Sequence, residues 1–156
     1  MANTTYNSST VAQVQPAITQ GLVRNSLNLH DTVSLPSTFV TTDVAAFGWI
    51  PNNAVIDQVV LKAQTQLDSN GTPTLAFNVG VTGTPALFFS AITTVGRAAG
   101  ASYETLMAAG GKLYKNTSGA KQRVDVSPSA NAATAVAGVL EVQVRYHIEE
   151  TVGSQA

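Results

Sequence analysis

The sequence predicts an all-β protein, an antiparallel β-sandwich for which the jelly-roll type is preferred. Three features of the 156-residue chain support this fold. Apolar residues alternate with polar residues in several segments, which is the period of a half-buried strand. Roughly eight such segments are separated by turns at the intervals typical of a sandwich. The chain also lacks the regular succession of strand and helix that a parallel α/β fold requires.

The last strand is expected over residues 138–149, where the alternation is strongest. One face would carry Leu140, Val142, Val144, Tyr146 and Ile148, and the other Glu141, Gln143, Arg145, His147 and Glu149. A strand with one apolar and one polar face is typical of an antiparallel sheet that packs on a core and meets water on its other side.

A strand or strand pair is expected over residues 27–35, ending at Pro36. It is indicated by apolar residues that alternate with polar ones: Leu27, Leu29, Val33 and Leu35. Residues 39–42 are expected to form another short strand. The sequence Phe47-Gly-Trp49-Ile50-Pro51 is interpreted as a turn that carries two large aromatic side chains, because the proline and the two asparagines after it favour a break.

A hairpin is predicted from residues 54–67 and 74–81. Both segments alternate in hydropathy, and the first is rich in β-branched residues. Between them lies Asp68-Ser-Asn-Gly71, which favours a tight turn because Gly and Asn tolerate positive φ and an Asp side chain bonds nearby backbone. Two alternating segments around such a turn are typical of a hairpin.

The remaining expected elements are short. Residues 86–91 are apolar throughout and would form either a buried strand or a helical turn. At most one short helix is expected, over residues 102–108, with Ser102 as its N-cap. Strands are expected at residues 112–115 and 122–126, followed by a loop at 128–133.

The chain is divided into an extended N-terminal arm (1–20), a β-sandwich domain (21–150) and a C-terminal tail (151–156). The arm contains thinly spaced apolar residues, Val11, Val14 and Ile18, and Pro16 interrupts the helical turn that their spacing would allow. We interpret the arm as free or laid on a partner, with a disordered terminus as the alternative. Its three apolar side chains are candidate partner contacts.

The composition restricts the function. Charged residues make up 11% of the chain, and eight basic against nine acidic residues leave a net charge of −1. Direct nucleic-acid binding is disfavoured because it needs clustered Lys and Arg. No apolar segment approaches the ~20 residues that cross a bilayer, so no membrane partner is expected. A surface with little charge permits copies to associate closely, because repulsion between like charges is small.

The sequence offers little for catalysis, and we expect no catalytic residue, metal or cofactor. The two histidines, His30 and His147, are too few for a histidine metal site. His147 is expected to be a surface residue of the last strand. His30 lies beside Asp31 and would be either an oriented base or part of a turn. The segment from Asp68 begins like a calcium loop but lacks the later ligands.

Phe47 and Trp49 form the one compact aromatic candidate for stacking on a sugar, and both are further candidate partner contacts. A tryptophan in a loop is either a plug for the end of the sandwich or a platform for sugar rings. The second interpretation supports an alternative function, a carbohydrate-binding or host-attachment head-fibre module of the same fold.

Four segments resemble a known family: Phe47-Gly-Trp-Ile-Pro51, Ala54-Val-Ile-Asp-Gln-Val-Val-Leu-Lys62, Leu67-Asp-Ser-Asn-Gly-Thr-Pro-Thr-Leu75, and an Ala/Thr-rich loop that leads into the final strand at Ala132–Tyr146. On these residues, about 45–82 and 132–148, the chain is similar to the cement (decoration) proteins of tailed-bacteriophage capsids.

The resemblance implies a structural virion protein rather than an enzyme. It implies a jelly-roll cement protein, a homodimer or homotrimer, on the outer surface of an icosahedral head. Its partner would be the major capsid protein, and it would bind across neighbouring capsid subunits. It would be added to the virion in the host cytoplasm. The family acts through surfaces, so no catalytic residues carry over.

Overall fold

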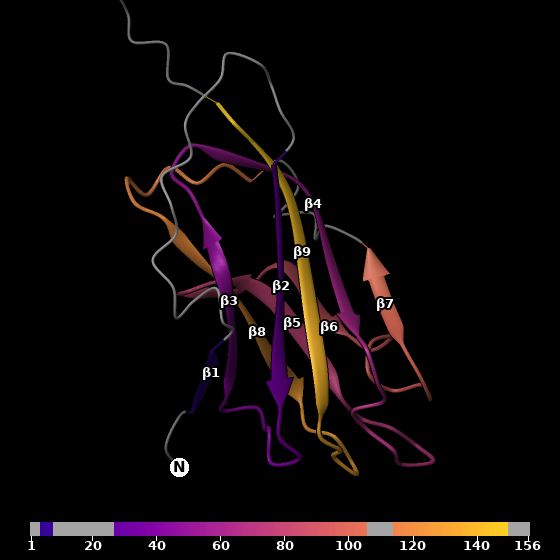
Figure 1. The fold of residues 1–156 in the computed structure, drawn as a ribbon. Coiled ribbons are helices and arrows are strands. Elements are labelled where there is room, and N and C mark those ends of the chain that lie inside the picture. Colours follow the sequence, from indigo (N-terminus) through magenta and orange to yellow (C-terminus); the bar gives the residue numbers. More distant parts are fainter. Residues whose placement is uncertain (1–3, 8–26, 106–113, 150–156) are drawn as a thin grey trace, which may run out of the picture.

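The computed structural model describes residues 4–7, 27–105 and 114–149. Within these ranges the chain forms strands and no helix, and two sheets pack face to face (Figure 1). The prediction of an all-β sandwich is therefore confirmed. The strands are β1 (Thr5–Asn7), β2 (Leu27–Leu35), β3 (Val44–Ile50), β4 (Ala54–Ala63), β5 (Ala76–Val81), β6 (Thr84–Ile92), β7 (Ser102–Thr105), β8 (Gln122–Ala130) and β9 (Gly138–Ile148). The described ranges contain no helix that could cross a membrane.

The five-stranded sheet has the order β1-β3-β8-β5-β6, and the four-stranded sheet has the order β2-β9-β4-β7. The β1–β3 pair is parallel, and the other strand pairs are antiparallel. From β2 to β9 each strand lies in the sheet opposite to its predecessor, except that β5 and β6 pair with each other. This connectivity is compatible with the jelly-roll type.

The core lies between the two sheets, and the strand alternation fills it as expected. β9 extends over nearly the whole predicted range, and its apolar face is buried. β2 alternates regularly, with Asp31 as the one polar residue among its buried positions. The largest fully buried side chains come from both sheets: Phe47, Phe77, Phe88, Ile50, Ile56, Leu61 and Leu140.

The predicted hairpin is wrong, because its two strands lie in different sheets. β4 pairs with β9 and β7, whereas β5 pairs with β6 and β8. The turn at 68–71 is part of a longer connection that crosses from one sheet to the other. The hairpin of this region is β5–β6, which closes around Thr82 and Gly83, with Gly83 at a φ of 88°. Gly83 thus takes the positive φ that a two-residue hairpin turn requires.

Asp68 anchors the connection that crosses from one sheet to the other. Its side chain is fully buried, and its carboxylate accepts hydrogen bonds from backbone N–H groups on two separate loops. Oδ2 accepts from Thr74, Leu75 and Ala133 at 2.8, 3.1 and 3.0 Å, and Oδ1 accepts from Thr134 at 3.0 Å. The aspartate therefore ties the β4–β5 connection to the β8–β9 loop. Because these donors occupy both oxygens, the structure gives no support to the calcium-loop alternative.

The predicted turn at Phe47–Ile50 is also wrong, since these residues belong to β3. Residues 39–42, expected to be a strand, form the turn that precedes β3. Asp43 holds this turn, because its Oδ2 accepts the N–H of Val40 at 3.1 Å. A bulge in β3 between Ala46 and Trp49 interrupts the alternation of inward and outward side chains, so the sequence of β3 lacks the regular period of a strand.

Three other predictions change in detail. Residues 86–91 lie in strand β6, which decides between the two alternatives left open. Ser102–Thr105 is an edge strand that pairs with β4 rather than the start of a helix, because strand pairing overrides a weak local preference for helix. The rest of the expected helix, residues 106–108, lies outside the described ranges. β8 continues through the predicted loop to Ala130, with Pro128 opposite Phe77. Of the strand expected at 112–115, Lys115 forms an isolated bridge with Val55, and 112–113 are not described.

Part of the N-terminal arm packs on the chain's own sandwich. β1 runs parallel to β3, and the backbone N–H of Val44 donates to the carbonyl of Thr4 at 3.0 Å. The ring of Tyr6 meets that of Phe39 edge-on, with 5.6 Å between the centroids. Val11, Val14 and Ile18 and the predicted tail 151–156 lie outside the described residues. The domain boundaries at 20 and 150 therefore stay predictions.

Candidate interaction surfaces

The outer face of the four-stranded sheet, which points away from the core, is a polar surface with a regular layout. On the central strand β9, Glu141, Gln143, Arg145 and His147 point outward. The register places Thr32 and Lys62 beside Glu141, and Asn28 and Gln58 beside Arg145. The antiparallel pairing of β2, β9 and β4 thus converts a sequence alternation into rows of polar side chains that run across three strands.

Glu141, which is only 6% exposed, is the centre of an ion-pair cluster on this face, and the side chains of its partners His30 and Lys62 are 52% and 39% exposed. His30 Nε2 lies 2.9 Å from its Oε1, and Lys62 Nζ lies 3.4 Å from its Oε2. The amides of Gln143 and Gln64 donate to the same two oxygens at 3.0 and 3.3 Å. Burial alone would raise the pKa of Glu141, but these two amides, His30 and the charge of Lys62 outweigh it and lower the pKa below 4.5.

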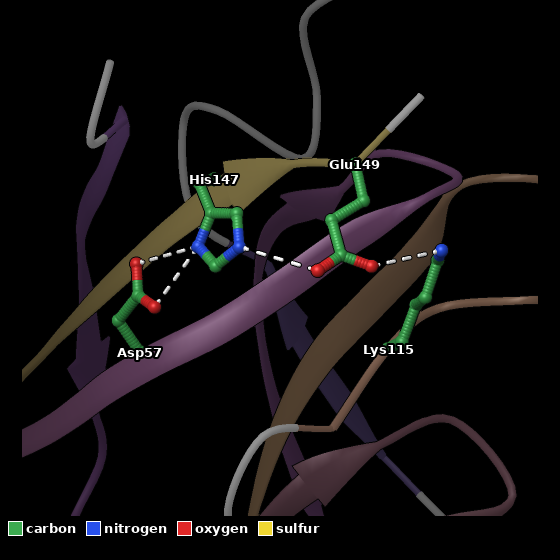
Figure 2. A network of polar contacts seen from close by, with 4 residues as sticks. All are labelled: Asp57, Lys115, His147 and Glu149. Atoms are coloured by element: carbon green, nitrogen blue, oxygen red, sulfur yellow. Dashed lines mark hydrogen bonds and ion pairs between the residues drawn. The ribbon is translucent and has the colours of Figure 1, made fainter. Parts of the chain in front are cut away.

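A second polar network lies at the other end of β9 (Figure 2). The Nδ1 atom of His147 lies 3.0 and 3.1 Å from the two carboxylate oxygens of Asp57. On its other side, Nε2 lies 3.8 Å from Glu149, whose second oxygen accepts a hydrogen bond from Lys115 Nζ at 3.1 Å. The hydrogen bond and charge of Lys115 lower the pKa of the exposed Glu149 carboxyl.

Local backbone features bring these four residues together. A bulge in β4 between Ile56 and Gln58 makes Asp57 the extra residue, which lets its carboxylate reach across to β9. Lys115 is fixed by its bridge to Val55 and by the adjacent Asn116, whose backbone bonds both Asn53 and Ala54. The network therefore joins the end of β9 to β4 and to the segment before β8.

This second network has the form of an oriented histidine but not the partners of a catalytic one. Asp57 orients the ring of His147, as a carboxylate does in a catalytic triad. Among the residues whose positions are described, the group that the opposite ring nitrogen faces is the Glu149 carboxylate rather than a hydroxyl. Among the described residues no group of three metal-ligating side chains is placed to hold a metal ion. The arrangement joins the end of β9 to its neighbours electrostatically.

We expect Glu141→Gln to lower the free energy of unfolding by about 1–2 kcal/mol at neutral pH, because His30 and Lys62 lose their common charged partner. Since folding lowers the pKa of Glu141, its stabilising effect is complete above 4.5 and is lost as the pH falls. Urea denaturation of both proteins at pH 7 and pH 3 checks this. A stability difference that is as large at pH 3 as at pH 7 would contradict the assignment.

The outer face of the five-stranded sheet carries a smaller polar and aromatic group. Trp49 is half-buried, and Lys121 Nζ lies 4.7 Å from the centroid of its ring, a cation–π contact. Beside it, Arg123 pairs with Asp125 through contacts of 2.6 and 3.2 Å. Asp125 also accepts the hydroxyl of Thr82 at 2.8 Å. The charge of Arg123 is thus neutralised by Asp125, and Lys121 packs on the ring of Trp49.

The structure separates the aromatic residues that the sequence grouped together. Phe47 is fully buried in the core and presents no surface to a partner, so we carry Trp49 alone forward as a candidate contact from this pair. His30 and Asp31 are also separated, because they occupy adjacent positions of β2: His30 is exposed and Asp31 is buried. Neither the oriented base nor the turn proposed for His30 and Asp31 is present. The partner of His30 is Glu141.

Sequence reasoning placed Glu141 and His147 on the polar face of β9 but missed both networks. Their partners come from β2, β4 and the segment at 115, and the sequence does not show which strands lie next to β9. Asp57 was also missed, because the alternation of apolar and polar residues does not reveal the bulge that directs its side chain toward β9. The one available signal was the concentration of opposite charges on a single strand face.

Comparison with known proteins shows the kind of assembly in which similar chains occur. No family model matches the chain, and no match was found among the curated proteins. Among solved structures, a chain of the cyanophage Pam1 capsid asymmetric unit is similar with a TM-score of 0.73 and 30% sequence identity, over 89% of this chain and 96% of that one. The chain belongs to a family of phage capsid-associated proteins.

A second solved structure agrees on the fold of this capsid-associated protein. A chain in the capsid of Ralstonia phage GP4 is similar with a TM-score of 0.75 and 22% identity, over 94% of this chain and 99% of that chain. In both comparisons the matched region covers nearly the whole length of the similar chain. The capsid-associated protein is thus a virion component with a structural role.

Proposed function

We propose that this protein is a cement protein, which binds the outer surface of a phage capsid and holds neighbouring capsid subunits together. The observation that carries the proposal is the likeness, over 89% of the chain, to a chain of a capsid asymmetric unit. We take its partners to be the major capsid protein and further copies of itself, as a homodimer or homotrimer. We assign the sandwich to the jelly-roll type on the strand orders of its two sheets.

The physical properties of the described residues support this proposal. A sandwich with a continuous apolar core is a stiff unit that can carry load between subunits. Its surface charges are largely neutralised by neighbours in the same chain, so many copies can lie close together without strong repulsion. Attachment at many equivalent sites then makes weak individual contacts sufficient. We expect no catalytic activity and no cofactor.

The arm supplies the first set of proposed contacts. Deletion of residues 1–20 would also remove β1, which packs on the sandwich, so substitution is the cleaner test. We expect replacement of Val11, Val14 and Ile18 by serine to reduce occupancy on purified heads several-fold, because the apolar anchor is lost. Val136→Ser, at an exposed apolar residue in the β8–β9 loop, is the matched control and should leave occupancy unchanged. Unchanged occupancy of the triple variant would rule out the arm.

The kind of contact can be tested with salt. If apolar and backbone contacts hold the protein on the head, 1 M NaCl should leave it attached, because salt screens exposed charges but not buried contacts. The carbohydrate-binding alternative is not favoured, since Lys121 occupies one face of the Trp49 ring. Absence of glycan binding at millimolar sugar would close that alternative.

A further inference from the structure

The middle row of the polar face of the four-stranded sheet differs from the rows on either side. Arg145, on the central strand β9, lies in register with Asn28 on β2 and Gln58 on β4. The side chain is exposed and makes no hydrogen bond or ion pair with any residue in the described ranges. The adjoining charged groups belong to the Glu141 cluster and to the Asp57–His147 network, which are already paired.

Every other lysine or arginine in the described ranges has a partner. Lys62 pairs with Glu141, Lys115 with Glu149 and Arg123 with Asp125. Arg97 donates to the backbone carbonyls of Leu75 and Thr74 at 2.5 and 3.0 Å, and Lys121 covers the ring of Trp49. Arg145 is therefore the one lysine or arginine in the described ranges that has no hydrogen bond, ion pair or ring contact, and it lies at the middle of a sheet face.

We propose that the Asn28–Arg145–Gln58 row is the docking point for an aspartate or glutamate on the surface of another virion protein, so that this face of the sandwich is turned toward the shell. The inference rests on the proposed function. An arginine guanidinium binds a carboxylate through two parallel hydrogen bonds, which fixes orientation as well as position. The flanking amides of Asn28 and Gln58 can donate to the same group or to its neighbours.

The acidic residues of this chain argue against a second copy as the occupant. The seven carboxylates whose side chains the structure describes each have a bonded partner: Asp31 and Asp43 bond backbone N–H groups, Asp57 bonds His147, Asp68 bonds two loops, Asp125 bonds Arg123, Glu141 bonds His30, and Glu149 bonds Lys115. A second copy that used one of these seven carboxylates would have to divide it between Arg145 and the partner that it already has. A partner with its own unpaired carboxylate requires no such exchange.

The test compares two variants that change the net charge equally. Arg145→Gln removes one positive charge from the proposed row, and Ser90→Glu adds one negative charge at an exposed position of β6, in the other sheet. Binding of each to heads that lack this protein is measured by co-sedimentation over a concentration series, and thermal melting verifies the fold. We expect Arg145→Gln to raise the Kd at least tenfold and Ser90→Glu to change it less than threefold, since hydrogen bonds to charged groups contribute strongly to binding.

The outcomes separate this inference from the proposed function. If the unmodified protein does not bind heads, the cement function fails. If it binds and Arg145→Gln binds equally well, the docking row is wrong. Equal weakening by both variants would assign the effect to overall charge and also overturn it. A smaller solution mass of Arg145→Gln would show that the row meets a second copy rather than another protein.

Discussion

Asp68→Asn is expected to lower the free energy of unfolding by about 3 kcal/mol or more, because one amide group cannot replace the acceptor that joins two loops. Oδ2 accepts three backbone N–H groups, from Thr74, Leu75 and Ala133. The single oxygen of an asparagine can occupy only one of the two positions, so its NH2 group would face either these three donors or the N–H of Thr134, and each buried donor left without an acceptor costs about 1–3 kcal/mol. Chemical denaturation at neutral pH measures the change.

Asp57→Asn provides the matched control for this experiment. It makes the same chemical change at a carboxylate whose side chain is 38% exposed and which faces His147. Because water can compensate for the lost contact, we expect a cost below about 1 kcal/mol. If the two variants lose similar stability, the assignment of Asp68 as the anchor of the two loops would be contradicted.

The effect of Asp68 also depends on pH. Burial would raise the pKa of its carboxyl, but the four backbone N–H groups outweigh this and hold the pKa far below its ordinary value of 3.8. The stabilisation is therefore present above pH 3.8 and is lost only as the pH falls through the lowered pKa. The stability difference between the wild-type protein and Asp68→Asn should stay large at pH 4 and shrink in stronger acid.

Phe47→Ala is expected to have the second large effect, a loss of about 3–5 kcal/mol. The ring is fully buried between the sheets, so truncation removes its contacts and leaves a cavity. For a chain of this size the loss corresponds to a fall in Tm of about 10 °C or more. Differential scanning calorimetry of the purified variant measures it.

Trp49→Ala is the control for Phe47→Ala, two residues further along β3. Trp49 is half-buried on the outer face, so its truncation should change Tm by only a few degrees. If Trp49 is a partner contact, the variant should fold normally and bind heads less tightly. Equal losses of Tm at the two positions would contradict the placement of Phe47 in the core and Trp49 outside it.

The sequence predicted the elements in which alternation is uninterrupted. β2 and β9 each have one apolar and one polar face, and their side chains lie where hydropathy places them. β3 was not predicted as a strand, because its bulge between Ala46 and Trp49 interrupts the two-residue period of hydropathy. β7 was missed because Ser102–Thr105 is only four residues long, too short for a clear hydropathy pattern, and is held by pairing with β4. Local hydropathy patterns therefore identify strands whose own side chains alternate regularly. They miss strands whose position is set by pairing with a neighbouring strand.

The hairpin error shows a second limit. Alternation in β4 and β5 correctly indicated two strands, but it contains no information on which sheet each strand joins. Residues 68–71 were interpreted as a turn stabilised by its own backbone, whereas Asp68 accepts hydrogen bonds from Ala133 and Thr134, more than sixty positions away. Likewise, Glu141 could be placed on the polar face, but its partners His30 and Lys62 follow only from the order β2-β9-β4.

The central claim, that the sandwich binds the outside of the capsid and joins its subunits, is tested most directly by imaging. Heads that lack this protein are incubated with the purified chain, and their structure is determined by electron cryo-microscopy. The account predicts added density of the size and shape of the β-sandwich on the outer surface, in contact with more than one capsid subunit. Heads that gain no density, or gain it on the inner surface, would contradict the claim.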